Sequence, residues 1–166
     1  MPLYGAPFQI ALVRAGRIFK DRARPFLVQV MSEQTSDGFK IVGVGVVEKD
    51  GKVLITQRKY DDHLGGVWEF PGGKKRADET DQACVERELS EELGISVRAA
   101  QHLETIRYAY PDRRLELRFY SCALLGGEAK PLEVQDFRWV SPGELIYYQF
   151  PKADRDLVER LAKKPN

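Results

Sequence analysis

The amino-acid sequence predicts an α+β fold in which a mixed β-sheet lies between α-helices. Two observations carry this prediction. The stretch FKIVGVGVVEKDGKVLITQR contains two apolar, β-branched runs joined at Asp50-Gly51, a dipeptide typical of tight hairpin turns. Further along, the stretch from Thr80 to Gly94 has the apolar spacing and the end residues of a helix. Strand and helix patterns thus follow one another along a single chain.

Length and composition fit one soluble domain. The chain has 166 residues, of which 43% are hydrophobic and 31% charged, and no apolar run approaches the roughly 20 residues that span a bilayer. A net charge of +1 gives no global field for nucleic acid, so any phosphate chemistry must arise locally. Cys84 and Cys122 are too few for a disulfide framework and lack metal-ligand spacing, so we expect a reducing, cytoplasmic setting.

The first 38 residues differ from the rest, and we treat them as an extension before a domain spanning 39–166. Their run QIALV followed by RAGRIFK fits a short hairpin near Gly16, and PFLVQV fits a further strand. A cleaved signal is not expected, because the apolar stretch is short and an Arg interrupts it. Three roles stay open: extra strands, dimerisation, or a stretch upstream of a true start at Met31.

Each later element has a local signal. The run GVWEFPGG predicts a short strand that ends where Pro71 and two glycines force a tight turn or a close approach to a ligand. Thr80 is a plausible helix N-cap, with Asp81 in the first turn and Gly94 as the natural stop. Strands are predicted near 103–110 and 115–125 and at DFRWV, with helix starts at SPGEL and in the tail from 154 to 163.

Three acidic side chains crowd the helix that begins near Thr80. At about 100° per residue, Glu88, Glu91 and Glu92 fall within one arc beside an apolar stripe. Like charges so placed repel, and a hard divalent cation such as Mg²⁺ or Mn²⁺ would remove the repulsion and bridge to substrate phosphates. From the cluster alone, a solvated charged face with surface ion pairs at Arg87 and its neighbours is the favoured interpretation, because charge runs usually are solvated faces.

The spacing of the whole segment favours the metal site. Seven identities hold fixed positions: Gly73, Glu79, Arg87, Glu88, Glu91, Glu92 and Gly94. Their chance coincidence has a probability on the order of 10⁻⁸ to 10⁻⁹ at average composition. With aliphatic residues at 89 and 95, the segment resembles the complete sequence box of the Nudix hydrolase family.

That resemblance implies a function and a set of roles. Members hydrolyse a diphosphate linked to another moiety, with a mixed sheet between helices. The resemblance implies that the three helix glutamates bind the metal and assist deprotonation of the attacking water, with the division of labour open. Arg87 and Glu79 would orient these carboxylates, and the Gly73 carbonyl would be a further ligand. Mg²⁺, or Mn²⁺ in its place, is the implied cofactor.

Outlying motifs resemble the MutT-like branch, which acts on nucleoside triphosphates and notably on oxidised guanine nucleotides. They are ITQR, GGVWEFPGGK, YAYPDRRLELRFY, DFRWVSP and FPKADRDLV. By position, Arg58 and Lys74 resemble phosphate-side residues, and Glu133 resembles an extra loop carboxylate near the metals. Tyr110 and Arg113 resemble residues that line the base pocket. Arg58 as a surface cation, Glu133 as a plain loop acid and Tyr110 as core packing remain alternatives.

Asp154 departs from the guanine-specific pattern, in which an Asn occupies this position. An ionised Asp only accepts hydrogen bonds, whereas Asn both donates and accepts. Asp suits the N1–H and amino group of guanine or the amino group of cytosine, so both bases stay open. Capping of the last helix is a second role that Asp154 can fill.

The sequence therefore predicts a Mg²⁺-dependent nucleoside triphosphate pyrophosphohydrolase that clears damaged or unwanted nucleotides. Alternatives are (d)CTP-type nucleotides or another diphosphate substrate, such as ADP-ribose, a dinucleoside polyphosphate or a capped RNA end. A non-catalytic nucleotide-binding module is the rival of a different class, although such modules usually lose box carboxylates and none is lost here. The expected partner is the nucleotide, with no membrane, no stable nucleic-acid partner, and a monomeric or homodimeric state.

Overall fold

The computed structural model describes residues 32–163, so the predicted hairpin near Gly16 and the PFLVQV strand lie outside the described residues. The elements follow the chain in this order: β1 (Lys40–Lys49), β2 (Lys52–Gln57), β3 (Trp68–Glu69), β4 (Gly72–Lys74), α1 (Asp81–Leu93), β5 (Ser96–Ala109), β6 (Arg114–Gly126), β7 (Asp136–Val140), the 3₁₀ helices η1 (Pro142–Tyr147) and η2 (Lys152–Asp154), and α2 (Arg155–Ala162).

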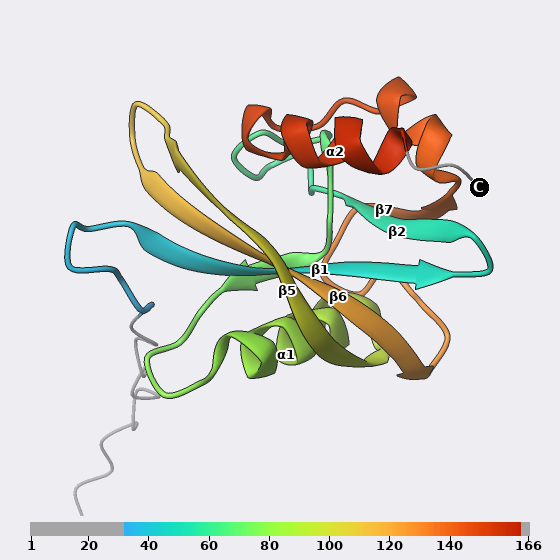
Figure 1. The fold of residues 1–166 in the computed structure, drawn as a ribbon, viewed down its shortest axis with the longest axis horizontal. Helices are drawn as coiled ribbons and strands as arrows, with labels where there is room; N and C mark the ends of the chain where they lie inside the picture. The colour runs from blue at the N-terminus through green and yellow to red at the C-terminus, as the bar shows by residue number, and fades with distance from the viewer. Residues whose placement is uncertain (1–31, 164–166) are drawn as a thin grey trace, which may run out of the picture.

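The strands form one mixed sheet with helices on both faces, as the sequence predicts (Figure 1). The strand order is β3-β2-β1-β6-β5, with β4 paired to β1 and β7 paired to β2. β1 runs parallel to β6, and the other pairs are antiparallel. α1 covers one face, and η1 and α2 cover the other (Figure 1).

The predicted turn at Asp50-Gly51 joins β1 to β2. Both residues have positive φ, 50° at Asp50 and 72° at Gly51. This backbone is the one that tight hairpin turns require, and a glycine adopts it without steric cost. The predicted hairpin is confirmed.

The predicted helix signals coincide with the ends of α1. Thr80 Oγ1 accepts a hydrogen bond from the Ala83 amide at 3.1 Å, and Gly94 ends the helix with a φ of 68°. Val85, Leu89 and Leu93 are fully buried, so the apolar stripe faces the sheet. The glutamates at the border of this stripe are thereby fixed beside the core.

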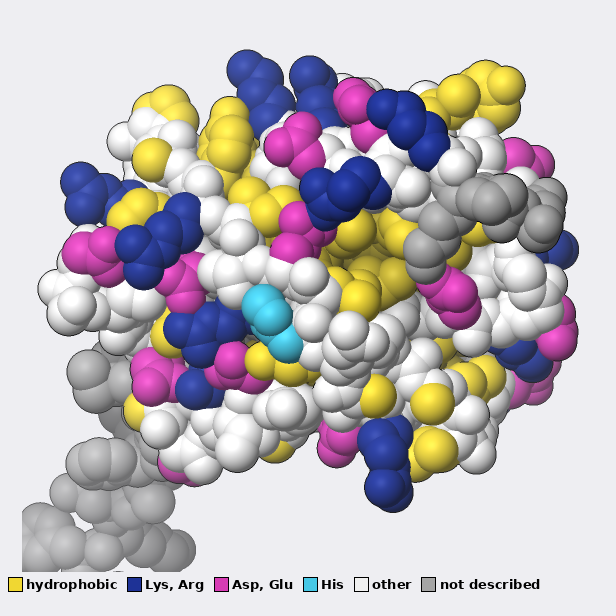
Figure 2. Space-filling view, in the orientation of Figure 1, with side chains coloured by type: hydrophobic (Ala, Val, Ile, Leu, Met, Phe, Trp, Pro, Cys, Tyr) yellow, Lys and Arg dark blue, Asp and Glu magenta, His cyan; other side chains and the backbone are white. Residues whose placement is uncertain are grey.

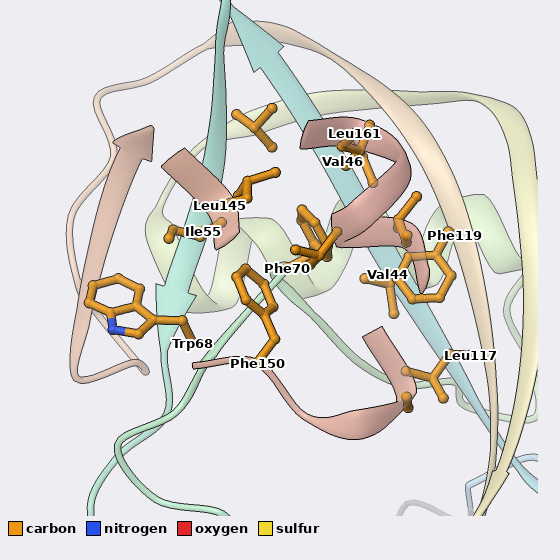
Figure 3. Close-up of a cluster of buried hydrophobic side chains, with 14 of the residues drawn as sticks. Val44, Val46, Ile55, Trp68, Phe70, Leu117, Phe119, Leu145, Phe150 and Leu161 are labelled. Atoms are coloured by element: carbon orange, nitrogen blue, oxygen red, sulfur yellow. The ribbon is translucent and has the colours of Figure 1, made fainter. Parts of the chain in front are cut away.

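Alternation along β1 divides the core into two layers. Gly43 and Gly45 face α1, where a Cβ would come within 3.1 Å of α1 side chains. Val44 and Val46 point to the opposite face, where they join a cluster that includes Phe70 and Phe150. Figure 3 shows these side chains between the sheet and the C-terminal helices. The Phe70 and Phe150 rings lie 5.4 Å apart, so the chain just before the glycine turn is anchored in this layer.

The C-terminal half also agrees with the predicted elements, with one difference in extent. β5 starts directly after α1, several residues earlier than the predicted strand near 103, because its first half pairs with β6 through register shifts that interrupt a simple alternation. At α2, Asp154 occupies the N-cap position but makes no side-chain capping hydrogen bond. Capping by this carboxyl group, the second role left open above, is therefore not found.

The surface carries no single-sign field on the face drawn in Figure 2, where basic and acidic side chains are interspersed. This distribution agrees with the net charge of +1. Within residues 32–163, no helix combines the length and the apolar content that crossing a membrane requires.

Candidate functional site

One cavity of about 590 Å³ brings together residues that are far apart in the sequence. It lies among β1, β4, α1, the β2–β3 loop, the β5–β6 turn and the start of the C-terminal helices. Nine residues singled out from the sequence line it: Arg58, Gly73, Lys74, Glu88, Glu92, Tyr110, Arg113, Glu133 and Asp154. Candidate metal ligands and candidate base-pocket residues therefore share one site.

The two glycines of β4 place the backbone where no side chain fits. Gly72 and Gly73 pair with Val44 and Gly43 of β1. A Cβ on Gly72 would lie 2.2 Å from the Gly43 carbonyl oxygen, and one on Gly73 would lie 2.3–2.5 Å from the carboxyl atoms of Glu88. The β4 backbone thus passes directly beside the acidic face of α1.

Arg87 is the centre of an ion-pair network that orients these acids. Its guanidinium donates to both carboxylate oxygens of Glu79 at 2.7 and 2.9 Å, to Glu88 at 2.7 Å and to Glu91 at 2.9 Å. It also donates to the Lys74 carbonyl oxygen at 3.2 Å. The hydrogen bonds from Arg87 lower the pKa of Glu79 to about 2. Arg87 and Glu79 do not line the cavity. Arg87, itself held by Glu79, fixes the carboxylates of Glu88 and Glu91.

Glu91 differs from its two neighbours. Its carboxylate is engaged by Arg76 at 3.2 Å as well as by Arg87, and it does not line the cavity. In residues 32–163, no three His, Cys, Asp or Glu side chains converge as a preformed metal cage would require. The role of Glu91 as a ligand stays a prediction.

The donor set in the cavity still suits a hard cation. Glu88, Glu92 and Glu133 offer only oxygen, and Mg²⁺ typically takes one or two carboxylates while keeping waters and substrate phosphates as its other ligands. The Gly73 carbonyl oxygen accepts from the buried Cys84 thiol at 3.5 Å, so its role as a ligand stays a prediction. Glu92 accepts a hydrogen bond from the Gly72 amide at 3.2 Å. Burial, followed by the nearby charges of Glu69 and Glu88, raises the pKa of Glu92 to about 9. A cation at this place would offset that crowding of acids.

The acid Glu69 also lines the cavity and was not singled out from the sequence. Arg58 donates to both of its carboxylate oxygens at 2.9 Å, and the Arg58 Nε donates to the His63 carbonyl oxygen at 2.7 Å. Burial raises the pKa of Glu69, although Arg58 acts in the opposite direction. The only sequence signal is an acid two residues before Pro71, in a strand too short to show periodicity. Arg58 is predicted from the sequence to face phosphates. One of its guanidinium nitrogens, Nη1, already binds the Glu69 carboxylate.

Tyr110 and Asp154 also line the cavity and lie close enough to interact electrostatically. The Tyr110 ring contacts Tyr108 at 4.6 Å and His63, edge to face, at 5.7 Å, so an aromatic contact links the β2–β3 loop to the β5–β6 turn. Asp154 is 3% exposed. Burial, with the charge of Glu69 next, raises the pKa of Asp154 to about 8. At neutral pH this carboxyl group is therefore mostly protonated, and it both donates and accepts hydrogen bonds.

The cationic side chains of the lining divide into two classes. Arg58 pairs with Glu69, and Arg113 pairs with Asp112 at 2.6 Å. Three lysines of the lining make no ion pair with any residue of 32–163: Lys40, Lys59 and Lys74. Lys40 and Lys59 were missed from the sequence, since an isolated lysine at a strand end carries no pattern. Lysines without a carboxylate partner are the cations best placed to meet phosphate oxygens.

The chain resembles known proteins in sequence and in fold. A NUDIX domain model matches residues 43–160. An 8-oxo-dGTP diphosphatase of Escherichia coli (strain K12) is 33% identical over 123 residues, which cover 74% of this chain and 95% of that protein. A CTP pyrophosphohydrolase of the same organism is 33% identical over 118 residues, covering 71% of this chain and 87% of that protein. A MutT protein from Methanosarcina mazei Go1 has a TM-score of 0.68 at 22% identity, covering 76% of this chain and 96% of that one, a likeness of fold alone.

Proposed function

This chain belongs to the Nudix hydrolase family, and from that premise we propose that it is a Mg²⁺-dependent pyrophosphohydrolase of nucleoside triphosphates. The observation that carries the proposal is the single cavity of about 590 Å³, in which the acids of α1 and the aromatic and acidic groups at Tyr110 and Asp154 lie together. The acids suit a cation with its phosphates, and the groups at Tyr110 and Asp154 suit a base. The reaction adds water across an anhydride bond and gives a nucleoside monophosphate, pyrophosphate and a proton.

Glu88 and Glu92 are the residues we assign to hold the cation, with Glu91, Glu133 and the Gly73 carbonyl as further candidates. The cation, when bound, neutralises phosphate charge and lowers the pKa of water. Glu88 and its neighbours on α1 accept the proton of the attacking water. Arg87 and Glu79 fix the directions of these carboxylates, a contribution that typically changes metal affinity or activity by about 10- to 100-fold when lost.

Cationic side chains and the aromatic wall position the rest of the substrate. Lys74 lies next to Gly73 on β4 and is assigned to the phosphates, together with the part of the Arg58 guanidinium that Glu69 leaves free. Tyr110 offers an aromatic face to the base, and Arg113 lies on the same turn. Asp154 is assigned to the base edge.

The preferred base is the finer part of the proposal. The similarity to an 8-oxo-dGTP diphosphatase and that to a CTP pyrophosphohydrolase support oxidised guanine and cytidine nucleotides about equally. A buried Asp154 that is largely neutral at pH 7 presents both a donor and an acceptor, as an amide does. This suits a base edge with an acceptor next to an N–H group, and both the O6 and N1–H edge of 8-oxoguanine and the N3 and amino edge of cytosine are of this kind.

Product analysis over a nucleotide panel tests the proposal. The panel contains 8-oxo-dGTP, dGTP, dCTP, 5-methyl-dCTP and ADP-ribose, each with Mg²⁺, with Mn²⁺ and with EDTA. We expect monophosphate and pyrophosphate from at least one triphosphate, and only when a cation is present. Hydrolysis of ADP-ribose alone would move the protein to the second substrate class. Glu88→Gln should abolish turnover, and unchanged turnover in that variant would contradict catalysis at this cavity.

We further propose that the protein acts on free nucleotides in the cytoplasm, without a stable nucleic-acid partner, as a monomer or homodimer. The net charge of +1 supports this, because the chain as a whole has almost no excess of positive charge with which to attract a polynucleotide. Light scattering coupled to size-exclusion chromatography measures the oligomeric state.

A further inference from the structure

Arg76 lies in the segment between β4 and α1, and its side chain reaches one of the three acids that the sequence predicts as ligands. The Arg76 Nη2 donates to Glu91 Oε1 at 3.2 Å, and the Arg87 Nη1 donates to Glu91 Oε2 at 2.9 Å. A guanidinium therefore engages each oxygen of this carboxylate. The negative charge of Glu91 is already offset at both oxygens by groups of the protein itself.

The two arginines differ in how firmly they are held. Arg87 also pairs with Glu79 and Glu88, and its side chain is 17% exposed. Within residues 32–163, the Arg76 guanidinium pairs with no acid other than Glu91, and both side chains of this pair are 38% exposed. An ion pair that water reaches contributes little stability. Arg76 is thus the partner that Glu91 can lose while the rest of the network stays intact.

The backbone of Arg76 is fixed independently of its side chain. Its amide donates to Glu79 Oε1 at 2.8 Å, and the residue forms an isolated bridge with Ser32. The guanidinium can therefore swing into solvent while the segment that carries it stays in place. Its charge also acts on a second acid of α1. Burial raises the pKa of Glu88, and Arg87 and Arg76 both oppose this rise.

We propose that Arg76 is a positioning residue that competes with the cation for Glu91, and this rests on the proposed cation site. A divalent cation on this carboxylate would be brought close to the guanidinium that contacts the same group, and the two positive charges repel. Glu91 therefore becomes a ligand only when Arg76 swings away. The protein accordingly binds cations in two classes, a tighter one at Glu88 and Glu92 and a weaker one that includes Glu91.

Mn²⁺ binding without substrate tests the inference. The electron paramagnetic resonance signal of free Mn²⁺ measures the unbound ion, so a titration gives the affinity of each class. We expect Arg76→Met to tighten the weaker class by about 2- to 5-fold, the size of one lost exposed ion pair. Unchanged or weaker binding in Arg76→Met would overturn the inference.

Two further variants locate the effect. Arg160→Met is the matched control, because Arg160 pairs with Glu104 away from the cavity and is 56% exposed. This variant should bind Mn²⁺ as the wild type does. When Arg76→Met is made in Glu91→Gln, it should no longer tighten binding, because the carboxylate that it releases is gone. A gain that survives in the double variant would mean that Arg76 acts through its overall charge, against the inference.

The Arg76 side chain gives a second readout in the wild type. Its Nε–Hε signal in nuclear magnetic resonance is assigned by its loss in Arg76→Met. As Mg²⁺ saturates the protein, we expect this signal to move toward that of free arginine in water, while the Arg160 signal stays in place. An Arg76 signal that does not move would contradict displacement. If the wild type binds neither Mg²⁺ nor Mn²⁺, the proposed function fails; if it binds and hydrolyses but both Arg76 readouts stay flat, only this inference fails.

Discussion

Gly73 and Glu88 are in such close contact that a methyl group at position 73 would overlap the carboxylate. A Cβ there would lie 2.3–2.5 Å from three carboxyl atoms of Glu88. Because β4 is fixed by its pairing with β1, the carboxylate has to move instead. The position of this candidate ligand therefore depends on the absence of a side chain on the neighbouring strand.

Gly73→Ala should thus lower kcat/KM by at least about 100-fold while leaving the protein folded, since loss of one well-placed catalytic interaction costs about 3 kcal/mol. The measurement is steady-state hydrolysis of the best nucleotide with Mg²⁺, alongside thermal unfolding. Gly126→Ala is the matched control, because a Cβ at Gly126 meets nothing within 4 Å. Full activity in Gly73→Ala would show that the Glu88 carboxylate can be relocated without consequence.

Glu79→Gln should reveal the strength of the Glu79–Arg87 pair through its pH dependence. Hydrogen bonds from Arg87 lower the pKa of Glu79 to about 2, below the ordinary value of 4.5. An acid with a lowered folded-state pKa stabilises the protein above its unfolded pKa, and that stability is lost as the pH falls toward 2. We expect the variant to be about 2 kcal/mol less stable at pH 7, and the difference to shrink between pH 4.5 and pH 2.

Urea unfolding across this pH range measures the effect. Asp78→Asn is the control, because Asp78 is an exposed acid next to Glu79. A stability difference that does not change with pH would mean that Glu79 contributes through its shape and not through its charge.

The Arg58–Glu69 pair should show energetic coupling. The two side chains are 28% and 22% exposed, and Arg58 contacts both carboxylate oxygens. Removing one partner leaves the other charge partly buried, so each single variant, Arg58→Met or Glu69→Gln, should lose about 1–3 kcal/mol of stability, and the double variant should lose less than the sum.

A double-mutant cycle by chemical denaturation gives the coupling free energy. The exposed pair of Glu159 and Lys163, at 3.8 Å, is a suitable control and should give close to zero. Additive effects at Arg58 and Glu69 would mean that their contact adds nothing to stability.

Asp154 should make base preference depend on pH. With a pKa raised to about 8 by burial and by Glu69, its carboxyl group is neutral and can donate below that pH, and it only accepts above it. The ratio of kcat/KM for 8-oxo-dGTP over dCTP should therefore change by about 10-fold or more between pH 7 and pH 9, as expected when one base-reading hydrogen bond is lost.

Asp154→Asn removes the titration while keeping a donor and an acceptor, so its ratio should stay nearly flat over the same range and resemble that of the wild type at pH 7. The control is Asp156→Asn, an exposed acid in the first turn of α2. An equal pH dependence in wild type and Asp154→Asn would remove Asp154 from base selection.

Lys40 should contribute to substrate binding through its charge. It lines the cavity from the first position of β1 and pairs with no acid of residues 32–163. Lys40→Met should raise KM for the triphosphate by about 3- to 10-fold with little change in kcat, in keeping with one lost charge-assisted contact. Lys49→Met, at the exposed far end of the same strand, should leave KM unchanged. If the two variants behave alike, Lys40 does not meet the substrate.

Local signals in the sequence determined most secondary-structure elements and the chemistry of one side of the cavity. The turn at Asp50-Gly51 and the ends of α1 at Thr80 and Gly94 depend on backbone conformations and caps that involve only neighbouring residues. The acidic face of α1 follows from helical spacing in the same way. Such features can be predicted because their physical causes lie within a few residues of each other.

Tertiary structure alone decided which distant side chains complete the cavity. Parallel pairing of β1 with β6 and the packing of α2 bring Tyr110 and Asp154 into the same cavity as Gly73. The pairing of β2 with β3 places Arg58 beside Glu69, and the segment between β4 and α1 places Arg76 beside Glu91. No local pattern encodes these contacts, because each depends on strand register and on how strongly tertiary packing desolvates the charged groups.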